Sequence, residues 1–240
     1  MKSDDFGMTN KNIKKRKETL VVLSSPSGAG KTTICRRILK KHRDYIYSVS
    51  VTTRERRRGE IPGKHYFFMT EAEFERRIKK REFVEWAWVH TKRYGTLKKY
   101  VTKAKKESKV ALFVPDVQGG MAFKKKYPDC ILIFILPPSL DELKRRLHHR
   151  GTENKEEMKQ RLMTALKEIK FWSKYDYVVI NKNLSQTVKS VERIIQAERL
   201  KSTRFDYARW NKYRMTNKKA MTNENKENGR WKKENKSNDE

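Results

Sequence analysis

Apolar residues in this chain fall into short continuous runs that are separated by longer amphipathic stretches. The continuous runs cover residues 20–23, 110–114, 130–136 and 177–180. Such runs are typical of strands that are buried on both faces of a parallel sheet. Helical spacing of apolar residues is found in the stretches 33–41, 100–107, 139–150, 156–172 and 184–195. The pattern predicts an α/β fold, a parallel sheet flanked by helices.

The segment 46–97 has a different pattern. The runs Tyr45–Val51 and Glu82–Val89 alternate between apolar and polar residues, as strands with one exposed face do. A further short strand is expected at 94–96, and the sequence from Thr70 to Glu73 is typical of a capped helix start. We therefore expect a β-rich insertion, 46–97, carried by a core made of 18–45 and 98–200.

Both ends of the chain have few aliphatic residues with which to build a core. Residues 1–17 and the Asn/Lys/Glu-rich tail 201–240 are therefore predicted to be basic and disordered. These ends carry net charges of +4 and +6, so that +20 of the total net charge of +30 lies on residues 18–200. A field of this size attracts nucleotides and nucleic acids alike, and it cannot choose between them.

Composition also bears on the cellular setting. The two cysteines, Cys35 and Cys130, have no metal-ligand spacing, and we interpret them as buried free thiols in a reducing compartment. No apolar run reaches the length of a membrane span, and the first residues lack the apolar segment of a signal peptide. We expect a cytoplasmic protein without a membrane partner.

The segment Ser25–Thr32 carries the clearest chemical signal. It lies between the first predicted strand and the first predicted helix, and it ends in Gly30, Lys31 and Thr32. In this context backbone N–H groups and a helix N-terminus can hold a polyphosphate. Lys31 would then reach the β- and γ-phosphates of ATP, and the Thr32 hydroxyl would bind Mg²⁺. The alternative is an ordinary glycine-rich turn, and Ser25 stands where the usual pattern begins with glycine.

Four stretches of the chain resemble, in order, a single family. They are residues 25–32, 48–96, 115–119 and 146–161, and the similarity extends over about 19–200. In these stretches the chain is similar to guanylate kinases of the bacterial type. The resemblance implies a P-loop nucleoside-monophosphate kinase, with 46–97 as the GMP-binding insertion and a helical lid near 146–161. The implied reaction transfers the γ-phosphoryl group of ATP to GMP, and also to dGMP, in purine nucleotide metabolism.

The resemblance also implies how GMP would be held. The matching residues are Ser50, Arg54, Arg57, Tyr66, Glu85, Tyr94, Thr96 and Asp116. Arginine suits the acceptor phosphate because its guanidinium group binds phosphate bidentately and stays charged. Glu85 would accept the two hydrogen bonds that guanine donates from N1–H and its N2 amino group. Adenine has an acceptor at N1, so it would leave this carboxylate unpaired.

The ATP side and the catalytic residues follow from the same resemblance. The expected ATP-binding residues are Ser25, Pro26, Ser27, Gly28, Ala29, Gly30, Lys31, Thr32, Thr33 and Asn181. Lys31, Arg146, Arg150 and Arg161 are the expected catalytic residues, because fixed cations favour the charge that spreads over the transferring group. No catalytic base is expected, since the acceptor is an already ionised phosphate.

Three departures from the family pattern stand out. Val114 occupies the position of a first acid that commonly precedes Asp116, so metal affinity or rate is expected to be lower than is typical. Arg56 stands where proline is usual, and Lys182 replaces the acid that often follows Asn181. Mg²⁺ can still be held by Thr32, the phosphates and water.

Two other functions remain open from the sequence. The departure at Val114 would fit a guanylate-kinase-like module that binds a protein and has lost catalysis, although such a module has no need of an ATP site. The net charge would fit an NTPase that binds nucleic acid, but no aromatic-rich RNA-binding motif supports it, and we expect only nonspecific attraction. The expected partners are GMP and ATP, and a homodimer is left open.

Overall fold

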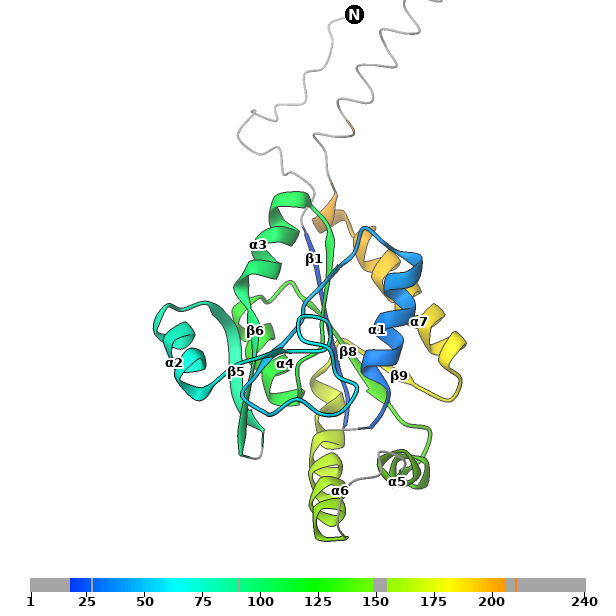
Figure 1. Ribbon diagram of the computed structural model, residues 1–240. Coiled ribbons are helices and arrows are strands. Elements are labelled where there is room, and N and C mark those ends of the chain that lie inside the picture. The colour runs from blue at the N-terminus through cyan, green and yellow to red at the C-terminus, as the bar shows by residue number, and fades with distance from the viewer. Residues whose placement is uncertain (1–17, 27, 90, 149–154, 206–209, 211–240) are drawn as a thin grey trace, which may run out of the picture. The chain divides into compact units, whose positions relative to one another are not determined.

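The computed structural model describes residues 18–26, 28–89, 91–148, 155–205 and 210 (Figure 1). The chain divides into two compact units, one formed by Glu18–Arg199 and one that comprises Met1–Lys17 and Leu200–Glu240. The second unit has one described element, the short 3-10 helix η3 (Ser202–Arg204). The predicted disorder of 1–17 and of most of 201–240 falls outside the described residues. No described helix has both the length and the apolar character that crossing a membrane requires.

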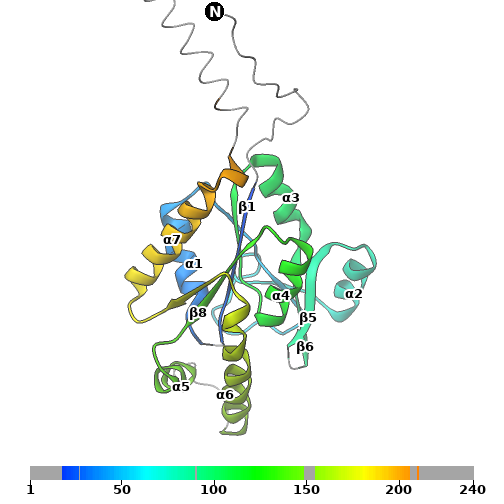
Figure 2. The same ribbon diagram turned by 180° about the vertical axis from the view of Figure 1, so that it is seen from behind.

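A five-stranded parallel sheet forms the centre of the unit 18–199 (Figures 1 and 2). Its strands, in the order β2-β7-β1-β8-β9, are β2 (Ile46–Tyr47), β7 (Val110–Phe113), β1 (Thr19–Ser24), β8 (Ile131–Leu136) and β9 (Tyr177–Ile180). Every pairing between neighbouring strands is parallel. The predicted sheet is therefore confirmed.

The continuous apolar runs arise because both faces of this sheet are covered. On one face Val21 and Leu23 pack with α1 (Lys31–Lys41) and α7 (Leu184–Arg199). On the other face Leu20 and Val22 pack with α3 (Lys98–Glu107) and α4 (Val117–Lys126). Successive residues of β1 thus face opposite sides, and neither side is polar. Figures 1 and 2 show these helix pairs on the two faces.

The insertion forms a second sheet with its own small core. Its strands, in the order β4-β3-β6-β5, are β4 (Phe67–Phe68), β3 (Val51–Thr52), β6 (Lys92–Leu97) and β5 (Phe83–Val89). The helix α2 (Glu71–Lys79) begins at the predicted capping box, in which the Thr70 hydroxyl accepts from the Glu73 N–H. Phe74 of this helix stacks on Phe83, with ring centroids 4.6 Å apart.

One predicted boundary is wrong. The run 45–51 does not form a single strand of the insertion, because β2 pairs with β7 of the large sheet whereas β3 pairs with β4 and β6. The chain crosses from one sheet to the other at Ser48–Ser50, and the Ser48 N–H still donates to the Leu112 carbonyl at 2.9 Å. The insertion therefore begins at about residue 48, not at 46.

Two further helices follow β8. They are α5 (Leu140–His148) and α6 (Lys155–Ile169), and α6 continues as the 3-10 helix η2 (Lys170–Lys174). Leu143 and Leu147 of α5 pack with Ala165 of α6 in a separate small apolar cluster. The predicted end of α5 at Arg150 lies outside the described residues.

Candidate active site

The loop after β1 has glycine at two positions where the backbone conformation and close neighbours favour it. Gly28 and Gly30 have φ values of +86° and +99°, a region that other residues rarely adopt. A Cβ atom on Gly28 would lie 3.2 Å from the Leu147 side chain, and one on Gly30 would lie 2.9 Å from Nδ2 of Asn181. Gly30 is the N-cap of α1. The loop therefore leads directly into a helix N-terminus, an end that favours anions.

Lys31 and Asn181 fix this loop from two sides. The Nζ of Lys31 donates to the carbonyl oxygen and to the hydroxyl of Ser25, both at 2.9 Å. Asn181 follows β9 and is buried; its Nδ2 donates to the Ala29 carbonyl at 2.9 Å. Its Oδ1 accepts from the Thr187 hydroxyl at 3.0 Å. Asn181 thus supports the loop backbone, and its predicted contact with adenine stays a prediction.

Arg54 is the centre of a second cluster, in the insertion. Its Nε donates to the Tyr94 hydroxyl at 3.2 Å, and its guanidinium lies over the Tyr66 ring, 5.5 Å from the centroid. The rings of Tyr66 and Tyr94 meet edge to face, with centroids 5.9 Å apart. Three of the residues expected to bind the acceptor phosphate therefore lie together.

The carboxylate of Glu60 forms an ion pair with the guanidinium group of Arg54. Its carboxylate accepts from the Arg54 Nη2 at 2.8 and 3.0 Å, and it also accepts from the Arg57 N–H at 2.9 Å. Burial alone would raise the pKa of Glu60, but these hydrogen bonds outweigh it and lower the pKa. The Arg57 side chain is exposed. Glu60 is not among the residues predicted for the site, although its position in a loop of arginines is a signal in the sequence.

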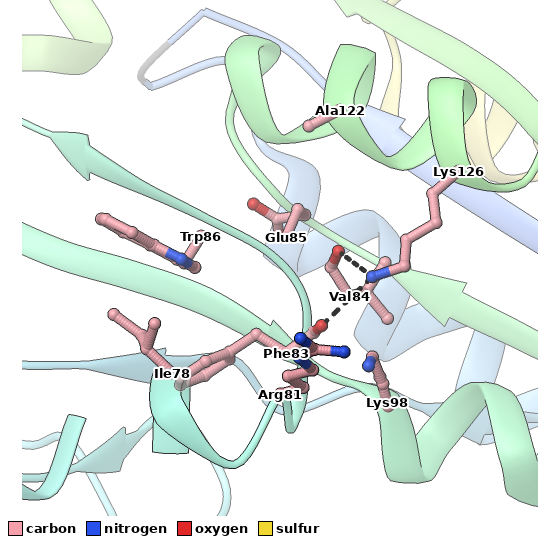
Figure 3. Close-up of a pocket in the computed structure, with 9 residues that line it drawn as sticks. All are labelled: Ile78, Arg81, Phe83, Val84, Glu85, Trp86, Lys98, Ala122 and Lys126. Atoms are coloured by element: carbon pink, nitrogen blue, oxygen red, sulfur yellow. Dashed lines mark hydrogen bonds between the residues drawn. The ribbon is translucent and has the colours of Figure 1, made fainter. Parts of the chain in front are cut away.

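Glu85 is a buried carboxylate on β5, with 9% of its surface exposed. Burial raises its pKa to about 7, the nearby charge of Asp116 adds to the increase, and a hydrogen bond from Thr96 opposes it. The side chain points toward α4 (Figure 3), and a Cβ atom on Gly119 would lie only 2.6 Å from Oε2 of Glu85. Gly119 therefore leaves the space that this carboxylate occupies.

Asp116 connects the two halves of the site. It is the N-cap of α4, and its Oδ1 accepts from the Gly119 N–H at 2.7 Å. Burial raises the pKa of Asp116, while the Gly119 hydrogen bond and the charge of Lys31 lower it. Asp116 thus interacts electrostatically with Glu85 on one side and with Lys31 on the other. This geometry follows from the sheet, because β7 and β1 are neighbours and their carboxyl ends lie together.

The remaining candidates lie on several elements or outside the described residues. Thr32 and Thr33 are exposed in the first turn of α1, Thr96 is buried on β6, and Ser50 is half-buried just before β3. Ser27 and Arg150 are not among the described residues.

Two lid candidates are described, Arg146 and Arg161. Arg146 on α5 donates from Nε to Glu142 at 2.7 Å and from Nη2 to the Asn181 carbonyl at 3.2 Å. The guanidinium groups of Arg145 and Arg146 lower the pKa of Glu142 to about 2. Arg161 is half-buried on α6. Arg146 is thereby joined to Asn181, the residue that supports the phosphate loop.

Comparisons with known proteins identify the family. The family model described as guanylate kinase matches residues 17–198. The chain belongs to the guanylate kinase family. It is 44% identical over 190 residues to the guanylate kinase of Caldanaerobacter subterraneus subsp. tengcongensis. The matched region covers 79% of this chain and 92% of that relative. It is 45% identical over 197 residues to a guanylate kinase of Clostridium perfringens, covering 82% and 91%.

The fold agrees with a solved member of the family. The crystal structure of guanylate kinase from Anaplasma phagocytophilum superposes with a TM-score of 0.68 at 34% identity, covering 79% of this chain and 90% of that one. The predicted family and fold class are therefore confirmed. The roles of individual residues stay predictions.

The guanylate kinase family implies ATP as a substrate and, typically, Mg²⁺. Among the described residues, no group of three or more His, Cys, Asp or Glu side chains could hold a metal ion. The exposed Thr32 hydroxyl at the helix N-terminus fits Mg²⁺, which commonly keeps several waters and binds through substrate phosphates. Val114, at the position of the missing first acid, packs against the core of the large sheet.

Proposed function

We propose that this guanylate kinase transfers the γ-phosphoryl group of ATP to GMP and to dGMP in a cleft between the phosphate loop and the insertion. Phosphorylation of GMP at the expense of ATP is the activity of the family to which the chain belongs. The observation that supports the proposed site best is the position of Asp116 between the phosphate loop and Glu85. The Ser24 hydroxyl, at the end of β1, donates to the Asp116 carbonyl at 3.3 Å, and Gly119, which donates to the Asp116 carboxylate, lies against the Glu85 carboxylate. The phosphate loop and the proposed base-binding carboxylate therefore lie on either side of one segment, as a site for two nucleotides requires.

The acceptor side of the proposed site has a phosphate end and a base end. Arg54, Tyr66 and Tyr94 offer a guanidinium group and two hydroxyl groups to the GMP phosphate. Arg57 would add a second guanidinium group from the same loop. At the base end, Glu85 accepts from the N1–H and the N2 amino group of guanine. Ser50, Thr96 and Asp116 complete the proposed contacts, and the insertion from about residue 48 to 97 is the proposed GMP domain.

The donor side uses the loop 25–33. Lys31 exchanges its hydrogen bonds to Ser25 for the phosphates of ATP. Thr32 would hold Mg²⁺, which would offset the charge of the phosphates. Arg146, Arg150 and Arg161 belong to a proposed lid near 146–161 that closes over the transferring group. Closure excludes water, which would otherwise accept the phosphoryl group in place of GMP. A cytoplasmic location remains a prediction from the sequence, which leaves a homodimer open.

The direct test is the formation of ADP by the purified full-length chain. We expect Mg²⁺-dependent turnover of ATP with GMP and with dGMP, and no stimulation by AMP. A chain that binds ATP but gives no GMP-stimulated ADP would contradict the proposal and favour a binding module that has lost catalysis. Turnover that rises with added polynucleotide instead of GMP would favour a nucleic-acid-dependent NTPase.

We expect Glu60→Gln to lower the KM for GMP about threefold at an unchanged kcat. In the parent, the GMP phosphate must compete with the Glu60 carboxylate for the Arg54 guanidinium group, and the neutral amide of glutamine weakens this competition. The effect is small because a partly exposed ion pair stabilises by only about 0.2–1 kcal/mol. The measurement is the KM for GMP at saturating ATP. Glu55→Gln is the matched control, because it removes an exposed acid from the same loop. A raised KM would instead mean that Glu60 positions Arg54 for binding.

A further inference from the structure

A pocket of about 390 Å³ lies beside β5, between the end of α2, the start of α3 and α4 (Figure 3). Its volume is in the range of small-molecule sites, roughly 300–1,000 Å³. Three cationic side chains line it, Arg81, Lys98 and Lys126. The single acid among its lining residues is Glu85, whose carboxyl end points away from the Lys126 ammonium (Figure 3). The charge of the pocket therefore favours an anion.

The rest of the pocket wall is apolar. Ile78, Phe83 and Trp86 contribute to it, and Trp86 is 40% exposed. An edge-to-face contact with Phe74, with centroids 6.2 Å apart, holds the Trp86 ring. A ligand that matches both parts would have an anionic group and an apolar or aromatic body. Phosphate suits the three cations because its oxygens accept several charge-assisted hydrogen bonds.

Lys126 links this pocket to the strand that carries Glu85. Its Nζ donates to the carbonyl oxygens of Val84 at 3.0 Å and Phe83 at 3.4 Å, the two residues that precede Glu85. Burial, and then the nearby charge of Lys98, lower the pKa of the Lys126 ammonium. An anion between these two ammonium groups would relieve their repulsion and compete with the carbonyls for Lys126.

Arg81 has a backbone conformation that favours glycine. Its φ is +54°, just after α2, where its N–H donates to the Ile78 carbonyl at 2.8 Å. Glycine is common at this position after a helix because the left-handed region strains residues that carry a Cβ. The chain thus keeps a cationic side chain here at a conformational cost. The same backbone strain occurs at Ser108, after α3, where φ is +52°.

We propose that this pocket binds a small phosphate ester with an apolar or aromatic body, and that its occupant changes the affinity of the enzyme for GMP through Lys126 and β5. The binding part stands on the pocket alone, whereas the effect on GMP rests on the proposed function. The two parts are therefore tested by separate measurements.

The binding part is tested by titrating the isotope-labelled full-length chain with phenyl phosphate while recording backbone amide chemical shifts. We expect saturable shifts at residues 81–86, 98 and 122–126. Inorganic phosphate should shift the same amides more weakly, because it lacks the apolar body. Shifts confined to the loop 25–33, or to the Arg54 cluster, would overturn the proposal.

Two glycine variants separate the ligand site from backbone strain. Arg81→Gly and Ser108→Gly both relieve a positive φ, so we expect both to unfold at the parent temperature or above it. Only Arg81→Gly should weaken phenyl phosphate binding, by about tenfold, the loss expected for one charged hydrogen-bonding partner. Equal affinity in Arg81→Gly and in the parent would overturn the proposed site.

The coupling part is tested by measuring the KM for GMP with and without saturating phenyl phosphate. We expect at least a twofold change in the parent and in Lys125→Gln, an exposed lysine next to Lys126. In Arg81→Gly the same change should require about tenfold more phenyl phosphate. Simple competition at the GMP site would show the same concentration dependence in Arg81→Gly as in the parent and would overturn the coupling. A chain that shows the amide shifts but never forms ADP with GMP would contradict the proposed function and leave the binding site standing.

Discussion

Replacing Lys31 with Met should lower kcat for GMP phosphorylation by about 10²–10³-fold, the usual cost of removing one preorganised group that stabilises transition-state charge. Lys31 is the first residue of α1 and lies across the phosphate loop, with its Nζ 2.9 Å from two oxygens of Ser25. These oxygens hold the ammonium group in place without neutralising it. The group can therefore move to phosphate with little reorganisation, and methionine keeps the length of the side chain without its charge.

Lys40→Met is the matched control for this variant. Lys40 lies at the other end of α1 and is exposed, so the same loss of charge is tested in the same helix but away from the loop. We expect an unchanged kcat for Lys40→Met and near-native thermal unfolding for both variants. A Lys31→Met enzyme with kcat within about tenfold of the parent would mean that the phosphates are held without this side chain.

The fold of the core could be predicted from the sequence because its signals are local and repeated. The run 20–23 is apolar at every position, and β1 indeed faces helices on both sides. The loop 25–32 is equally local, because glycine spacing and the adjoining strand and helix identify it. These features need no knowledge of which strand pairs with which.

Pairing between distant segments was not predictable in the same way. The run 45–51 alternates like one strand, yet β2 and β3 join different sheets, a choice decided by their neighbours β7 and β6. Glu60 was missed for a related reason. Its role depends on the side chain of Arg54 folding back across the loop, and a carboxylate near several arginines has many possible partners.

The state of Glu85 also depends on residues that are distant in sequence. An acid in an alternating strand usually faces water, whereas α4 covers this one, with Gly119 leaving the space that its carboxylate needs. Asp116, 31 positions along the chain, adds a second negative charge. The sequence could indicate guanine recognition through family resemblance, but not the energetic cost of keeping an ionised carboxylate there.

Glu85→Gln should lower kcat/KM for GMP by about 10³–10⁴-fold, because a site built on buried hydrogen bonds loses this much when one partner no longer matches. The glutamine oxygen can accept from guanine, but its NH₂ group faces a second guanine donor. Glu82→Gln, which removes a partly exposed carboxylate paired with Arg77, is the control and should leave GMP kinetics unchanged.

The same variant should stabilise the enzyme without ligand, and only above a certain pH. The pKa of Glu85 is about 7 in the folded chain and 4.5 by reference, so between these values the folded state keeps a proton that the unfolded state has released. Stability of the parent therefore falls as pH rises from 4.5 to 7 and then loses nothing more from this group. Glutamine does not titrate, so the gain from Glu85→Gln should be near zero at pH 4.5. It should grow to at most about 3 kcal/mol by pH 8.

The affinity for GMP should depend on the same titration, but ionisation of Glu85, which lowers stability, should strengthen GMP binding. Guanine needs the ionised carboxylate, so the KM of the parent for GMP should fall as pH rises through 7 and then level off. The GMP phosphate also titrates near pH 6, but that effect is shared by parent and variant and cancels in the ratio of their KM values. The ratio should therefore change with pH only through Glu85. Either of two results would contradict this account: a stability gain from Glu85→Gln that is equal at pH 5 and pH 8, or a ratio of KM values that does not vary with pH. Each would show that the Glu85 carboxyl group does not titrate between these pH values, and that its ionisation does not control the binding of guanine.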